Sequence, residues 1–191
     1  TIEGMAARVL TETRYDTFAL AGLSMGGIVA MEIVRQAPER VERLALLDTN
    51  HLPDTPERRD GRAQQIEWVK VGKLTSVMRD LKPFYVAPAH RGDPVLDAIF
   101  MGMAETLGPD VFIRQTRALM ARGDASDVLR GYRGKTLLLC GEFDEPCPPS
   151  RHAEMAELLD RCDLIVVEGA GHVTTLEAPD AVTRALQNWL Q

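Results

Sequence analysis

The sequence predicts an α/β protein with a mostly parallel sheet flanked by helices. Strand-length apolar runs alternate with helix-length amphipathic segments near both ends of the chain, and this alternation is typical of parallel strands joined by helical crossovers. Several of the runs are continuously apolar, as expected for strands covered on both faces. The middle of the chain, residues 51 to 134, lacks such runs and predicts a helical insertion.

The amino-terminal part of the chain supplies two of the predicted strands. A helix is expected at residues 2 to 13, where apolar residues recur at helical spacing, and a strand is expected at 17 to 23. The helix at 25 to 36 is apolar on most sides, so we expect it to be buried, and Pro38 marks its end. The apolar run at 44 to 48 is too short for a helix and predicts a second parallel strand.

The carboxyl-terminal part repeats this pattern. Strands are predicted at residues 136 to 140 and 164 to 167, with a helix at 150 to 160 between them. The last helix, at 179 to 190, begins with a proline, which is favoured at the first helical position.

The insertion at residues 51 to 134 is predicted to be a helical cap, because its pattern is helical and proline and glycine divide it. Apolar spacing predicts helices around 66 to 74, 96 to 103 and 111 to 120. The two segments predicted to form the core are residues 1 to 50 and 135 to 191.

Bulk composition limits the classes of function. A chain of 191 residues fits one domain with a subdomain. Its net charge of −6 disfavours nucleic acid as a partner. We expect no membrane partner and a cytoplasmic location, because no apolar run approaches a membrane span and no targeting pattern is evident. Cys140, Cys147 and Cys162 lack metal-like spacing and are expected to be free thiols.

Ser24 lies in the segment Gly22-Leu23-Ser24-Met25-Gly26, between a predicted strand and a predicted helix. This placement is typical of a nucleophile elbow, in which flanking glycines permit close approach of neighbouring chain. The first N–H groups of the helix would face a developing oxyanion. The alternative is an ordinary helix N-cap serine.

Two partners for a nucleophilic serine follow later strands. Asp144 comes after the strand at 136 to 140, and His172 after the strand at 164 to 167. Because the carboxyl ends of parallel strands share one edge of a sheet, these side chains can converge there with Ser24. The order serine, acid, histidine is also that of a sheet-borne triad. Rival carboxylates that could replace Asp144 are Glu142, Glu145 and Asp48.

Together these motifs resemble those of the α/β-hydrolase fold family, and the chain is similar to the carboxyl-terminal two-thirds of that fold. It is similar in particular to small esterases with a helical cap, such as carrier-protein methyl ester esterases and enol-lactonases. The resemblance implies that Ser24 is the nucleophile and that His172 is the general base and then the acid. It further implies that Asp144 orients His172, that the Met25 backbone N–H is an oxyanion donor, and that no metal or organic cofactor is needed.

The chain departs from the family at its amino terminus. Family members begin with strands and a loop that supplies a second oxyanion N–H, and nothing here corresponds to them. The strand at 17 to 23 would then lie at an exposed sheet edge. We therefore expect either further polypeptide upstream of Thr1 or a partner copy of the chain that covers this edge.

These observations predict a serine hydrolase that cleaves a small carboxylic ester, thioester or lactone through an acyl-enzyme. One alternative keeps the triad but performs carbon–carbon bond hydrolysis or acyl transfer. Another is a truncated, non-catalytic binding module. Under the cap, either core packing or an acyl pocket would account for Trp68, Phe84, Phe100 and Met101. The pair Arg58-Arg59 is either solvated or available to an anionic substrate.

Overall fold

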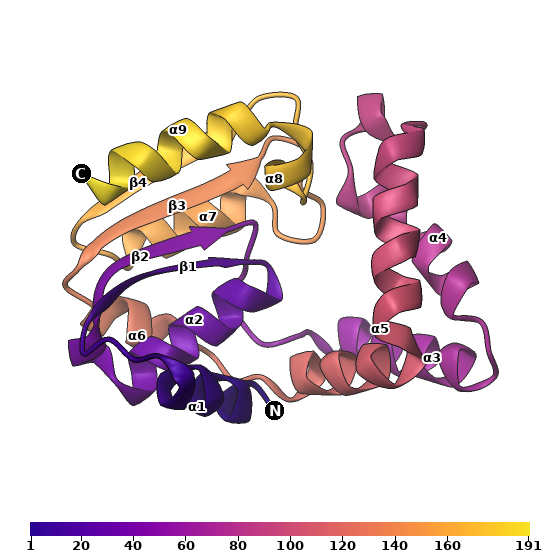
Figure 1. Ribbon diagram of the computed structural model, residues 1–191, viewed down its shortest axis with the longest axis horizontal. Coiled ribbons are helices and arrows are strands. Elements are labelled where there is room, and N and C mark those ends of the chain that lie inside the picture. Colours follow the sequence, from indigo (N-terminus) through magenta and orange to yellow (C-terminus); the bar gives the residue numbers. More distant parts are fainter.

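The computed structural model describes all residues, 1–191, and its centre is a four-stranded, all-parallel sheet with strand order β1-β2-β3-β4 (Figure 1). The predicted α/β class and parallel sheet are confirmed. The strands are β1 (Phe18–Leu23), β2 (Val41–Leu47), β3 (Lys135–Gly141) and β4 (Cys162–Val167).

The helices alternate with the strands at both ends of the chain and gather between β2 and β3 in the middle. They are α1 (Ile2–Glu12), α2 (Met25–Gln36), α3 (Pro56–Lys70), α4 (Leu74–Tyr85), α5 (Pro94–Ala121), α6 (Ser126–Gly131), α7 (Pro149–Glu157), α8 (Thr174–Glu177) and α9 (Pro179–Leu190), with single 3₁₀ turns η1 (Pro38–Arg40) and η2 (Pro88–His90). None of them has both the length and the apolar character that crossing a membrane requires.

The sheet has a hydrophobic layer on each face. On one face, Met31 and Ile33 of α2 and Met155 of α7 pack with Leu44 and Leu46 of β2. On the other face, α9 packs against the alternate residues of β2 and β3 through a cluster that includes its Trp189. Burial of both faces explains why the central strands read as unbroken apolar runs.

Helices α3, α4 and α5 stand apart from these layers, on the side of the molecule toward which the strand arrows point (Figure 1). By contrast, α6 returns to the sheet, because its Leu129 belongs to the same core cluster as α2. The division into a core and a cap at residues 51 to 134 stays a prediction.

Inside this helical segment, the expected helix around residues 66 to 74 is wrong in its bounds. The chain turns at Gly72, with a φ of 83°, and a separate helix, α4, begins at Leu74. The turn satisfies the end of α3, because the Gly72 and Lys73 N–H groups donate to carbonyls of its last turn. The two helices expected at 96 to 103 and 111 to 120 are joined in α5, which kinks at Gly108, where φ is 75° and ψ is 176°.

Candidate functional site

Ser24 occupies the sharp turn between β1 and α2. Its φ of 51° and ψ of −115° lie in a region that residues with a Cβ rarely adopt. The Ser24 N–H donates to the Leu47 carbonyl at 2.8 Å, so the turn is fixed to the end of the neighbouring strand. Met25 is the first residue of α2, so its N–H has no acceptor within the helix. A strained serine followed by a free N–H is the backbone of a nucleophile elbow.

The glycines around this turn differ in their importance. A Cβ at Gly22 would lie 2.3 Å from the Gly26 carbonyl oxygen, so Gly22 permits the close approach that the sequence motif predicts. Nothing lies within 4 Å of a Cβ built at Gly26. The crowded residue in the helix is Gly27, where a Cβ would lie 2.6 Å from Thr49 Oγ1. Gly27 lies outside the five-residue motif, and its contact is with a residue beyond β2.

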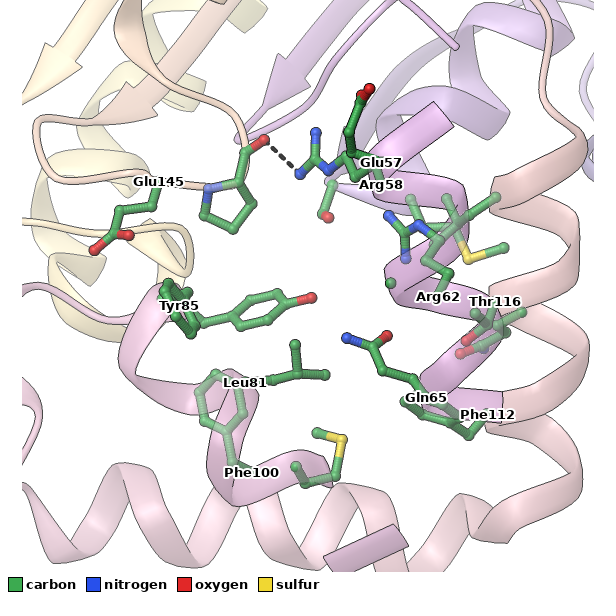
Figure 2. A pocket seen from close by; sticks show the side chains of 18 residues that line it. Glu57, Arg58, Arg62, Gln65, Leu81, Tyr85, Phe100, Phe112, Thr116 and Glu145 are labelled. Atoms are coloured by element: carbon green, nitrogen blue, oxygen red, sulfur yellow. Dashed lines mark hydrogen bonds between the residues drawn. The ribbon is translucent and has the colours of Figure 1, made fainter. Parts of the chain in front are cut away.

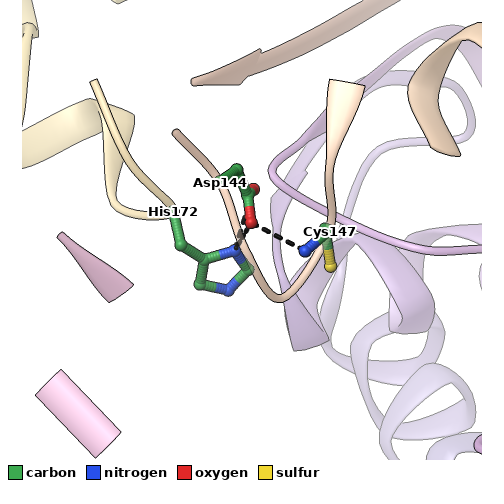
Figure 3. Close-up of side chains that lie close together, drawn as sticks. All are labelled: Asp144, Cys147 and His172. Carbon is green, nitrogen blue, oxygen red and sulfur yellow. Dashed lines mark hydrogen bonds and ion pairs between the residues drawn. The ribbon is translucent and has the colours of Figure 1, made fainter. Parts of the chain in front are cut away.

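Asp144 lies in the turn after β3, and its carboxylate is buried. It accepts a 2.7 Å hydrogen bond from the Cys147 N–H, and both of its oxygens lie 2.9 Å from His172 Nδ1 (Figure 3). Because an ionised carboxylate only accepts, Nδ1 carries the proton in this arrangement.

His172 follows β4 and completes the connection to Ser24. Its Nε2 atom lies 2.8 Å from Ser24 Oγ, within hydrogen-bonding distance. With the proton on Nδ1, Nε2 is free to accept from the serine hydroxyl. The His172 N–H donates to the Tyr85 carbonyl at 2.9 Å, and the Tyr85 ring meets the imidazole edge-on with centroids 5.0 Å apart. The structure therefore brings Ser24, His172 and Asp144 into one hydrogen-bonded chain.

The rival carboxylates have other partners. Glu142 accepts from the Gly169 N–H, and Glu145 pairs with Arg91 on the surface. Asp48 is fully buried: one oxygen accepts from the Gly141 N–H and the other from the Thr174 N–H and hydroxyl. Burial raises the pKa of Asp48 to about 8. Asp48 thus joins the ends of β2 and β3 to α8, and of the four candidates Asp144 contacts His172.

The other histidines, His51, His90 and His152, lie outside this hydrogen-bonded chain. His152 Nε2 accepts from the Thr49 N–H at 3.2 Å, and burial lowers the pKa of this imidazole to about 4. His90 Nδ1 lies 2.9 Å from Glu177, whose side chain is fully buried. Burial also lowers the pKa of His51. The sequence analysis missed the buried contacts of Glu177, since nothing in its local pattern distinguishes it from a helix-surface acid.

A cavity of about 600 Å³ adjoins Ser24 and Met25 (Figure 2). Most of its wall comes from α3, α4 and α5. The 18 residues that line it are Ser24, Met25, Glu57, Arg58, Gly61, Arg62, Gln65, Met78, Leu81, Phe84, Tyr85, Phe100, Phe112, Gln115, Thr116, Leu119, Glu145 and Pro146.

The structure shows which of the residues with two possible roles in the sequence analysis line this cavity. Phe84 and Phe100 line it, whereas Trp68 lines a separate surface depression and Met101 lines neither. The two neighbouring arginines also differ in environment. Arg58 lines the cavity and is partly buried, whereas Arg59 is exposed.

Potential metal ligands within 4.8 Å of one another are offered by Asp144, Cys147 and His172. Figure 3 shows that Cys147 reaches Asp144 through its backbone N–H. Burial raises the pKa of the Cys147 thiol, which disfavours the thiolate that binds metal. The contacts of these residues therefore fit a proton-transfer chain better than a metal centre.

Comparisons with known proteins agree with this fold. A thermophilic esterase from Thermogutta terrifontis, solved with malate bound, superposes with a TM-score of 0.90 at 29% identity, over 100% of this chain and 72% of that one. The enol-lactonase from Burkholderia xenovorans LB400 has the same fold, with a TM-score of 0.89 at 21% identity, over 100% of this chain and 73% of that one.

Curated relatives are longer than this chain. The mouse sn-1-specific diacylglycerol lipase ABHD11 is 26% identical over 181 residues, which cover 87% of this chain and 58% of the mouse protein. A relative from Pseudomonas savastanoi is 25% identical over 171 residues, which cover 88% of this chain and 66% of the relative. The profile of the Alpha/beta hydrolase family matches residues 2–185, and the chain therefore belongs to that family.

Proposed function

We propose that this protein is a serine hydrolase that cleaves a small carboxylic ester, thioester or lactone through an acyl-enzyme. The observation that carries the proposal is the continuous contact from Ser24 Oγ to His172 Nε2, at 2.8 Å, and from His172 Nδ1 to Asp144, at 2.9 Å. The names of the relatives, which include an esterase and a lipase, support hydrolysis as the reaction class.

In the proposed reaction, Ser24 Oγ bonds to the substrate carbonyl carbon while its proton moves to His172 Nε2. The Met25 N–H is aimed at the oxyanion that forms. The bond to the leaving group then breaks, and His172 returns the proton to that group. Water attacks the acyl-enzyme with His172 again as base, and the acid and free Ser24 are regenerated.

The Asp144 carboxylate holds the imidazole in the tautomer that leaves Nε2 free to accept, and it stabilises the imidazolium that forms when the proton arrives. Burial of both side chains excludes water from this contact. We further propose that residues 51 to 134 are a cap, because α3, α4 and α5 supply most of the cavity wall beside Ser24.

A fluorophosphonate probe tests the proposal, because it forms a stable bond only with an activated serine. We expect the probe to label Ser24, and Ser24→Ala and His172→Ala to abolish labelling. Ser150→Ala removes an exposed serine at the start of α7 and should retain it. A folded protein, judged by circular dichroism, that the probe does not label would contradict the proposal and favour a non-catalytic binding module.

A further inference from the structure

The inward face of α3 is polar where it meets the cavity. Arg58, Gly61, Arg62 and Gln65 follow one another at helical spacing and all line the cavity. Further along the same helix, Ile66 and Val69 are buried, as expected for a face that packs inward. Polar groups on an inward helix face need partners, because burying them unpaired is costly.

The two arginines on this wall, Arg58 and Arg62, have one carboxylate partner between them, and Arg122, which lies outside the cavity lining, also pairs with that carboxylate. Arg62 pairs with Asp54 at 2.7 Å, and Arg122 pairs with the other oxygen of the same carboxylate at 2.9 Å. One buried carboxylate is therefore shared by two guanidinium groups. Arg58 donates at 2.9 Å to the Pro146 carbonyl, which is neutral, and forms no ion pair.

Two carboxylates at the cavity do not balance this charge. Glu145 pairs with Arg91 at 3.0 Å. Glu57 is exposed, and Figure 2 shows that its carboxylate points away from the cavity. The Gln65 amide and the Tyr85 hydroxyl point into the cavity from opposite walls (Figure 2). The cavity thus presents a cationic, donor-rich wall on α3.

The remaining walls are largely apolar. Their apolar residues are Met78, Leu81, Phe84, Phe100, Phe112 and Leu119, and Gln115 and Thr116 of α5 add two polar side chains. A ligand that matches both parts has an apolar body and one anionic group. A carboxylate fits best, because a guanidinium can hold its two oxygens side by side.

We propose that Arg58 and its neighbours on α3 bind a free carboxylate on the part of the substrate remote from the bond that is cleaved. This inference rests on the proposed function and narrows it to esters, thioesters or lactones that carry a second, anionic acid group. Arg58 is then a specificity-determining residue, and the adjacent Arg59 is not.

Two substrates with one leaving group test this inference: 4-nitrophenyl monoglutarate and its terminal methyl ester, which differ in the free carboxylate. We expect the wild type to prefer the free acid in kcat/KM by roughly tenfold or more, as for a hydrogen bond to a charged group. Arg58→Gln should remove most of this preference, and Arg58→Lys should retain part of it. Arg59→Gln is the matched control and should leave the preference unchanged.

The measured quantity is the ratio of kcat/KM for the free acid to kcat/KM for its methyl ester. A general loss of activity that follows from losing the Arg58 contact with Pro146 lowers both values and cancels in this ratio. Hydrolysis of both esters without a preference for the acid, or an equal preference in Arg58→Gln and Arg59→Gln, would overturn the inference but leave the hydrolase intact. No hydrolysis and no probe labelling of Ser24 would overturn both. If Ser24 is labelled but neither ester is hydrolysed, glutarate should slow labelling in the wild type and not in Arg58→Gln; no slowing would overturn the inference.

Discussion

The Glu177 carboxylate accepts a 2.7 Å hydrogen bond from the N–H of Gly171, the residue that precedes His172. Its other oxygen accepts from the Ala87 N–H at 2.7 Å and contacts His90 Nδ1 at 2.9 Å. One buried side chain therefore ties the segment between α4 and α5 to the loop that carries the imidazole.

Removal of this carboxylate should be costly for the fold. In Glu177→Ala, the N–H groups of Gly171 and Ala87 lose their acceptor, and each buried unpaired N–H costs about 1 to 3 kcal/mol. We expect the free energy of unfolding, measured with urea, to fall by about 2 to 4 kcal/mol. Glu168→Ala removes an exposed carboxylate in the loop between β4 and α8 and is the control. A similar effect of both variants would show that the Glu177 contacts are dispensable.

Asp144 provides a test of the histidine orientation. Asp144→Asn keeps the shape of the side chain but offers an amide to His172 Nδ1, so the tautomer that accepts from Ser24 is no longer favoured. Esterase kcat should fall by roughly 10⁴-fold, as in other serine triads. The exposed Asp163 on β4 gives a matched control, Asp163→Asn, which should be near wild type. Retention of most activity in Asp144→Asn would mean that another carboxylate orients the imidazole.

Neighbouring glycines in α2 should respond in opposite ways to alanine. In Gly27→Ala, the new methyl group would lie 2.6 Å from Thr49 Oγ1, and this overpacking should destabilise the protein by about 1 to 3 kcal/mol. In Gly26→Ala, nothing lies within 4 Å of the methyl group, and the helix should gain up to about 1 kcal/mol. Thermal unfolding of the two variants would check this, and an equal melting temperature for both would contradict it.

Asp48 should make stability depend on pH. Burial raises the pKa of Asp48 from 3.8 to about 8, so between these pH values the folded protein holds a proton that the unfolded chain releases. The contribution of this group to the free energy of unfolding therefore falls as pH rises through that range, by up to about 1.4 kcal/mol per pH unit.

Asp48→Asn should remove this dependence, because its amide does not titrate and asparagine tolerates the positive φ of 47° at this position. Urea unfolding of the wild type and the variant at pH 5 and pH 8 measures the difference. If the difference in free energy of unfolding between the wild type and Asp48→Asn is the same at both pH values, Asp48 does not titrate in this range.

Local sequence was sufficient to predict the strands and the three residues of the hydrogen-bonded chain. Ser24, Asp144 and His172 each follow an apolar run, and the carboxyl ends of parallel strands share one edge, so topology alone places them near each other. The bounds of α3 and α4 could not be predicted in the same way, because the helical spacing of apolar residues continues across the turn at Gly72 that separates the two helices.

The sequence by itself determined the alternation of strands and helices, the elbow at Ser24 and the order of its partners, because each depends on residues close together in the chain. Only the tertiary structure decided that Arg58 and not Arg59 faces the cavity, that Gly27 is crowded by Thr49, and that Glu177 holds Gly171 and Ala87. These depend on contacts between distant segments, whose relative positions are set by packing of the whole chain.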